Sequence, residues 1–270
     1  MRKHILGLIV ALAGFVGVAQ ASPVMPSFAG APAGWNVDRY APASFSDVGT
    51  YQGRSDVLGI GISTNDGYGS RPSGYNYTFY NTQGKSHPVS GGAGDTLSAD
   101  LFVPRDWANP ASGARRTDMW GVMTDGTTNV TGYPVIGFTN DGPEAPSSFI
   151  GFRTWDDTAG VWHDLANAVN YDGWNTLSIL FTGSAYKYSI NGVLADTIAA
   201  DPSAKDFSSV IMQAYNFAGY PASGDLGEVV ANDYTAHWSN TKSVPEPGTF
   251  ALAGIAIIGL GATRRRKMAS

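Results

Sequence analysis

The chain of 270 residues contains no cysteine, few charged residues and very little glutamate. The absence of cysteine excludes disulfides, thiolate metal sites and a cysteine nucleophile together. Charged residues make up 14% of the chain, and residues 22–244 hold 11 basic and 21 acidic residues, a net charge of about −10. A surface that binds a nucleic-acid backbone needs clustered lysine and arginine, so we expect no nucleic-acid partner.

The first 21 residues contain the three parts of a secretory signal peptide in the expected order. Basic residues at positions 2–4 precede an apolar run at 5–18, and Ala19 and Ala21 form the small-residue pattern that signal peptidase recognises. We therefore expect cleavage by signal peptidase after Ala21, so that the mature, exported chain begins at Ser22.

The C-terminus combines a short motif, an apolar run and a basic end. It consists of Val244, Pro245, Glu246 and Pro247, then apolar residues 249–262 and basic residues 264–267. The apolar run would form a helix of about 21 Å, which is shorter than the hydrocarbon core of ~30 Å. We therefore expect a short hydrophobic anchor helix that holds the chain in the inner membrane only transiently.

This C-terminus resembles the PEP-CTERM sorting signal of Gram-negative bacteria, which we assign to residues 245–268 after a linker at 239–244. The resemblance implies recognition by an exosortase and delivery to the cell envelope, the outer surface or the extracellular matrix. It covers only the last 26 or so residues, so it predicts where the protein goes and not what its main domain does.

Residues 22–238 have the pattern of one all-β domain, because turn residues recur every 8–12 positions between β-branched and aromatic runs. A short helical turn is expected only at residues 201–207. The expected strands are residues 56–63, 75–81, 96–103, 118–124, 134–139, 148–155, 174–182, 185–191, 193–198, 208–215 and 229–238.

Asn191-Gly192 lies between two alternating runs and predicts a type I′ hairpin, in which both central residues need a positive φ. The preceding strand has the pattern W-x-x-L-x-I from Trp174 to Ile179, and the hairpin has the pattern Y-x-Y-x-x-N-G from Tyr186. These residues resemble the central hairpin of concanavalin A-like and laminin G-like jelly rolls. The resemblance implies a two-sheet antiparallel β-sandwich.

Many jelly rolls of this kind are glycosidases, which need two carboxylates flanking the scissile bond. Residues 22–244 contain only two glutamates, Glu144 and Glu228, and neither belongs to a carboxylate pair on one strand face. Asp156 and Asp157 are adjacent, so on a strand they would face opposite sides. We therefore expect no catalytic residues, and a polysaccharide-active glycosidase or lyase with an Asp-based site remains the alternative.

Calcium is the one metal that the composition favours, because acidic and amide oxygens in turns suit a hard cation. The candidates are Asp233, which directly precedes the last expected strand, and Asp141. Both lie in Asn-Asp sequences, which are also common in ordinary turns. A structural Ca²⁺ ion is therefore the only cofactor that we consider.

Aromatic residues among turn formers offer a further functional clue, since flat rings can stack on sugars. The candidates for stacking are Tyr68, Tyr220, Trp155 and Trp162. Together these features predict an exported, non-catalytic envelope or matrix protein that binds a polysaccharide. A purely structural matrix or adhesion protein is the second alternative.

Overall fold

The computed structural model describes residues 24–140, 149–219 and 230–240. Several predicted residues lie outside this part of the chain: Ala19, Ala21, Ser22, Asp141, Tyr220, Val244, Pro245, Glu246 and Pro247. Among the described residues, no helix is long and apolar enough to cross a membrane.

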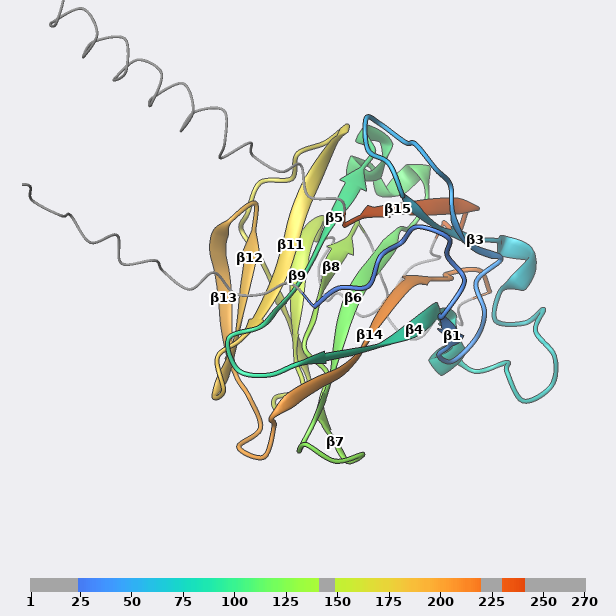
Figure 1. Cartoon of the computed structure of the whole chain (residues 1–270). Helices are drawn as coiled ribbons and strands as arrows, with labels where there is room; N and C mark the ends of the chain where they lie inside the picture. Colours follow the sequence, from blue (N-terminus) through green and yellow to red (C-terminus); the bar gives the residue numbers. More distant parts are fainter. Residues whose placement is uncertain (1–23, 141–148, 220–229, 241–270) are drawn as a thin grey trace, which may run out of the picture.

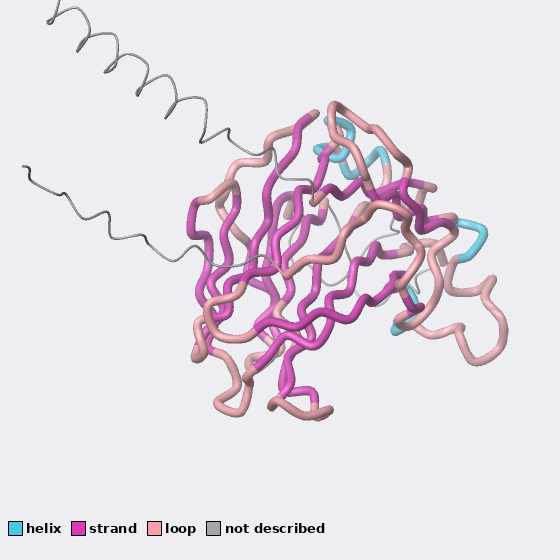
Figure 2. Tube along the Cα trace, in the orientation of Figure 1, coloured by secondary structure: helices cyan, strands magenta, loops and turns pink. Residues whose placement is uncertain are grey.

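Two antiparallel sheets form a jelly-roll sandwich, as the sequence predicted (Figure 1). One sheet has eight strands in the order β1-β4-β14-β6-β8-β9-β10, with β7 paired to β6, and the other has seven in the order β13-β12-β11-β5-β15-β3-β2. Strands dominate the trace, and the helices are short 3₁₀ turns (Figure 2).

The bounds of the elements follow the chain. The strands are β1 (Asn36–Val37), β2 (Ser44–Asp47), β3 (Leu58–Ile62), β4 (Thr82–Gly91), β5 (Thr96–Val103), β6 (Arg116–Thr124), β7 (Val130–Gly132), β8 (Val135–Thr139), β9 (Gly151–Asp156), β10 (Val161–Asp164), β11 (Gly173–Phe181), β12 (Ala185–Ile190), β13 (Val193–Ala199), β14 (Asp206–Tyr215) and β15 (Tyr234–Ser239). The 3₁₀ turns are η1 (Thr64–Asp66), η2 (Thr78–Asn81), η3 (Arg105–Ala108) and η4 (Pro110–Ser112).

The core lies between the two sheets and is built from alternating residues. On β11, Leu177 and Ile179 are fully buried, and on β5 Leu97 and Leu101 are fully buried as well. Since side chains alternate between the two faces of a strand, each set lies on one sheet face, as predicted. The eight-stranded sheet supplies the opposite half of the core, from Met119, Ile136, Phe138, Phe152 and Met212.

The predicted hairpin between β12 and β13 is confirmed. Asn191 and Gly192 have φ values of 51° and 78°, as a type I′ turn requires. The Asn191 side chain also accepts a hydrogen bond from the Thr176 amide at 2.8 Å, so the turn is fixed to the neighbouring strand β11.

Strand β15 joins the two sheets through its two large aromatic side chains. The Tyr234 hydroxyl lies 2.8 Å from the Arg116 carbonyl oxygen of β6 and 2.7 Å from the Tyr215 carbonyl oxygen of β14. The Trp238 indole donates to the Thr117 hydroxyl of β6 at 2.9 Å. These buried polar contacts hold the seven-stranded sheet against the middle of the eight-stranded sheet.

The predicted strand at residues 75–81 is wrong, since this segment contains an irregular stretch and then η2. The strand begins after it, as β4, which the sequence does not predict because β4 contains Pro88 and Gly84. At Pro88, β4 has a strand partner on one side only, opposite Ser209, and proline is tolerated where a strand has an open edge.

The helical turn predicted at residues 201–207 is also wrong. Asp201 instead accepts a hydrogen bond from the Ser203 amide at 2.7 Å, which forms a polar turn before β14. Short strands β1, β2, β7 and β10 were missed as well, since each has no more than four residues.

Candidate functional site

The eight-stranded sheet carries a cavity of about 950 Å³ on the face opposite the core. Its floor follows from the strand register. Trp120 of β6 pairs with Val135 of β8, Val135 pairs with Trp155 of β9, and Trp155 pairs with Trp162 of β10. Directly paired residues point to the same face, so these four side chains form a row across four strands.

A second row of paired residues runs beside the first. Asp118 of β6 pairs with Gly137 of β8, and Gly137 pairs with Arg153 of β9. The backbone at Gly137 leaves no room for a side chain, since a Cβ atom there would collide with an Asp118 carboxylate oxygen. Arg153 in turn pairs with Asp164 of β10, which lines the cavity.

Aromatic rings form much of the cavity wall. The rings of Trp155 and Trp162 have centroids 5.1 Å apart in a tilted arrangement. Tyr133 packs edge-on against Trp120, with centroids 6.2 Å apart. Phe79 of η2 lines the open side and is 58% exposed.

Three arginines line the cavity and stack on these rings. The Arg39 guanidinium lies 4.5 Å from the Trp120 ring centroid, and the Arg153 guanidinium lies 4.0 Å from that of Trp162. The Arg116 guanidinium also contacts Trp162, at 4.7 Å. Guanidinium groups stack on aromatic faces through cation–π attraction, so these arginines and rings hold each other in place.

Two carboxylates near the cavity, Asp118 and Asp157, are engaged by neighbouring groups. Asp118 is fully buried, and its Oδ2 accepts hydrogen bonds from Arg116 Nε at 2.8 Å and from the Gln213 side-chain amide. Asp157 lines the cavity and accepts hydrogen bonds from the Trp155 indole at 3.2 Å and the Tyr133 amide at 3.3 Å. Asp157 thus orients an aromatic wall of the cavity.

The adjacent acids Asp156 and Asp157 bind different groups. The Asp156 carboxylate accepts hydrogen bonds from the Thr158 amide at 3.0 Å and the Ala159 amide at 2.9 Å. It therefore closes the turn between β9 and β10. Glu144 and Glu228 lie outside the described residues.

Two of the four predicted stacking residues, Trp155 and Trp162, line the cavity together. Tyr68 does not line it. Its amide donates to the Ala218 carbonyl at 2.8 Å, in a loop contact away from the cavity floor. Tyr220 lies outside the described residues.

Phe79, Tyr215 and the three arginines were not predicted from the sequence. A local signal for part of the set exists, because Arg116, Asp118 and Trp120 alternate along β6. Such a period-two pattern of charged and aromatic residues places all three on one sheet face. Arg39 has no such signal, since it lies in the loop after β1.

No group of three or more metal-ligating side chains occurs within the described residues. Asp233 instead accepts hydrogen bonds from the Thr64 amide at 2.6 Å and the Thr64 hydroxyl at 2.8 Å. These hydrogen bonds lower the pKa of Asp233. In the structure this carboxylate thus fixes η1 against the start of β15, and calcium binding at Asp233 stays a prediction.

Comparison with known families identifies a PEP-CTERM protein-sorting motif at residues 243–267. The motif confirms the predicted resemblance and indicates export and exosortase-dependent delivery to the cell envelope or surface. Among curated protein sequences, none matches this chain.

Solved structures with a similar fold include carbohydrate-active proteins. A Bacillus licheniformis β-glucanase is 15% identical with a TM-score of 0.44, and the match covers 81% of this chain and 97% of that one. The carbohydrate-binding module CBM66 from Bacillus subtilis is 13% identical with a TM-score of 0.36, covering 77% and 92% of the two chains. A sialidase is 12% identical with a TM-score of 0.40, covering 76% of this chain but only 16% of the sialidase.

Proposed function

We propose that this chain is an exported, non-catalytic protein of the cell envelope or matrix that binds a polysaccharide in the cavity of its eight-stranded sheet. The observation that carries the proposal is the row of Trp120, Val135, Trp155 and Trp162 across the cavity floor. Three flat indole rings on one face offer apolar surface to the C–H faces of sugar rings, and the polar groups around them can bind hydroxyls.

The size and the rim of the cavity support a polymer as ligand. A volume of about 950 Å³ lies near the upper end of the range for small-molecule sites. Beyond Phe79, the exposed aromatic surface continues to Tyr77 and Tyr75, which are 60% and 42% exposed. Exposed rings that extend a cavity along the surface suit a chain that is longer than the cavity itself.

The state of the carboxylates supports binding without hydrolysis. Asp118 is buried against Arg116, and both oxygens of Asp157 accept hydrogen bonds from neighbouring groups. Neither is placed as a free acid and base on opposite sides of a sugar bond, which glycosidases require.

One observation favours a polysaccharide-active enzyme as the second candidate: Asp157 and Asp164 both line the cavity. Under that alternative, the purified exported protein would release reducing ends or unsaturated sugars from a polysaccharide that it binds. The double variant Asp157→Asn with Asp164→Asn would abolish the release. Binding without any such product supports the non-catalytic function.

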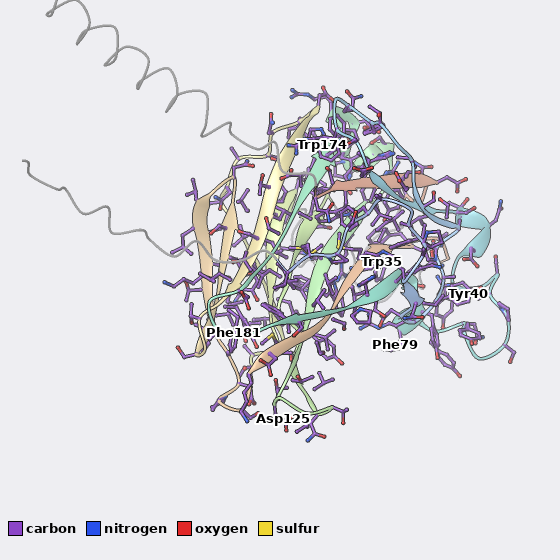
Figure 3. The ribbon with its side chains drawn as sticks, viewed as in Figure 1. Trp35, Tyr40, Phe79, Asp125, Trp174 and Phe181 are labelled. Carbon is purple, nitrogen blue, oxygen red and sulfur yellow. The ribbon has the colours of Figure 1, made fainter. Side chains whose placement is uncertain are left out.

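A glycan array with the purified exported protein tests the proposal. We expect binding to at least one bacterial polysaccharide, and we expect Trp162→Ala to weaken it about tenfold or more, because truncating an aromatic anchor of a binding site costs about 2 kcal/mol or more. The matched control is Trp174→Ala. Trp174 lies on the other sheet, well apart from Phe79 in Figure 3, and its indole donates to the Gln52 carbonyl. Equal loss in both variants, or no glycan bound by the wild type, contradicts the proposal.

The sorting signal has its own test. Replacing Pro245, Glu246 and Pro247 with alanine in the native host should leave a longer precursor in the inner membrane, because exosortase would no longer recognise the motif. Cell fractionation and immunoblotting measure both size and location. An unchanged size and location would contradict transient anchoring.

A further inference from the structure

Arg39 differs from Arg116, its neighbour in the cavity, in how its charge is compensated. Its guanidinium contacts two rings, 4.5 Å from the Trp120 centroid and 4.7 Å from the Phe79 centroid. Its ion pair within the described residues is with Asp38, where Nε lies 3.6 Å from a carboxylate oxygen. That distance is too long for a hydrogen bond, and Arg39 makes none with the described residues.

The surroundings of Arg39 favour an additional negative charge. Burial lowers the pKa of Arg39, and repulsion from Arg116 adds to this shift. The neighbouring Asp38 and Tyr133 oppose it. The side chain is only 19% exposed, so water compensates its charge less well than it does on an open surface. A ligand anion at the Arg39 fork would offset both the burial and the repulsion.

The charges of the cavity contrast with those of the whole domain. Residues 22–244 carry about ten more acidic than basic residues, yet the charged residues that line the cavity are three arginines and two aspartates. One of the two, Asp157, already accepts hydrogen bonds from the Trp155 indole and the Tyr133 amide. Neutral sugars do not require such an arrangement, since tryptophan and uncharged polar groups are enough to bind them.

We propose that the cavity binds an acidic polysaccharide, and that the Arg39 guanidinium pairs with a sugar carboxylate while the indole row stacks on the sugar rings. This inference rests on the proposed function and names the ligand class of the same site. The two rings contact the guanidinium, and its N–H groups make no hydrogen bond with the described residues, so they can donate to a ligand. The edge of a guanidinium matches the two oxygens of a carboxylate with two parallel hydrogen bonds.

The test compares two polymers that differ only in charge. Polygalacturonate and its carboxyl-reduced form have the same backbone and linkage, but in the second each carboxylate is replaced by a hydroxymethyl group. Isothermal titration calorimetry with the purified exported protein should give an affinity for polygalacturonate at least about tenfold higher than for the reduced form. The preference should shrink as the salt concentration rises, because ions screen the charge pair.

Variants assign the preference to Arg39. Arg39→Gln should lower the affinity for polygalacturonate about tenfold or more, and it should lower the affinity for the reduced polymer by a smaller factor, so the preference for the acidic polymer shrinks. Arg39→Lys keeps the charge but lacks the planar fork, so its affinity for polygalacturonate should lie between those of the wild type and Arg39→Gln. The matched control is Arg105→Gln, because Arg105 is 71% exposed, pairs with Asp172 and does not line the cavity. Thermal melting of each variant checks folding.

The comparison of polymers uses the wild-type protein, so it stands even if Arg39→Gln does not fold. Equal binding of both polymers overturns the acidic-ligand inference and leaves the proposed function in place. Binding of neutral glycans alone likewise overturns the acidic-ligand inference and leaves the proposed function in place. If Arg39→Gln folds and keeps the preference for the acidic polymer, the assignment to Arg39 is overturned. If no polysaccharide binds at all, the proposed function fails as well.

Discussion

The Tyr234 hydroxyl joins the two sheets, and removing it should destabilise the sandwich without creating a large cavity. Besides the two carbonyl oxygens of Arg116 and Tyr215, it accepts a hydrogen bond from the Tyr215 amide at 3.1 Å. One hydroxyl proton can serve only one carbonyl at a time. Tyr234→Phe therefore removes one donated and one accepted hydrogen bond from a buried place.

The magnitude follows from the two hydrogen bonds that the hydroxyl makes at one time, one as donor and one as acceptor. Each contributes about 0.5–1.5 kcal/mol, so the free energy of unfolding should fall by about 1–3 kcal/mol. For a domain of this size, 1 kcal/mol corresponds to roughly 2–4 °C in melting temperature, which gives a fall of about 2–12 °C. Thermal unfolding followed by circular dichroism, with urea titration as a second measurement, resolves such a change.

Tyr186→Phe is the matched control. Tyr186 is 5% exposed, and its hydroxyl has no hydrogen-bond partner among the described residues. Removing a buried hydroxyl without a partner should be neutral or slightly stabilising. If both variants melt alike, the hydroxyl of Tyr234 does not hold the sheets together, and the reasoning is refuted.

The same residue links stability to alkaline pH. Burial raises the pKa of Tyr234, although hydrogen bonds with Arg116 and Tyr215 oppose the shift. The unfolded chain therefore releases this proton near pH 10 while the folded chain keeps it, so Tyr234 contributes a stability that is present below pH 10 and is lost above it. Between pH 10 and 12, the stability of Tyr234→Phe should fall less steeply than that of the wild type.

Two further predictions concern a turn and an acidic residue. Gly192→Val should lower stability by about 1–3 kcal/mol, because valine is strained at φ 78°, whereas Gly69→Val, in open space and without a positive φ, should melt like the wild type. Burial would raise the pKa of Asp196, but hydrogen bonds from Thr154 and His163 outweigh it and hold the pKa below its usual value. The folding stability that ionised Asp196 contributes is present above the unfolded pKa of about 4 and is lost in acid. Below pH 4, the urea midpoint of Asp196→Asn should therefore fall less steeply than that of the wild type. An equally steep fall in both proteins would contradict this prediction.

The sequence by itself determined the features that depend on neighbouring residues. Strands β5 and β11 follow from period-two alternation, and the β12–β13 hairpin follows from Asn191-Gly192, because a turn and a strand face are local properties. The sorting motif at the C-terminus is likewise a short run of residues. For the same reason β4 was missed, since Pro88 is unfavourable locally and is tolerated only because of which strands lie beside it.

The cavity was decided by the tertiary structure. Trp155 and Trp162 could be chosen from the sequence as candidates for stacking, but nothing local indicated that Trp120 shares their row, because the order β6-β8-β9-β10 and its register set that row. Arg39 reaches Trp120 from a loop some 80 residues earlier. Contacts between residues so far apart depend on how whole sheets pair and pack, and the order of side chains along the chain does not carry that information.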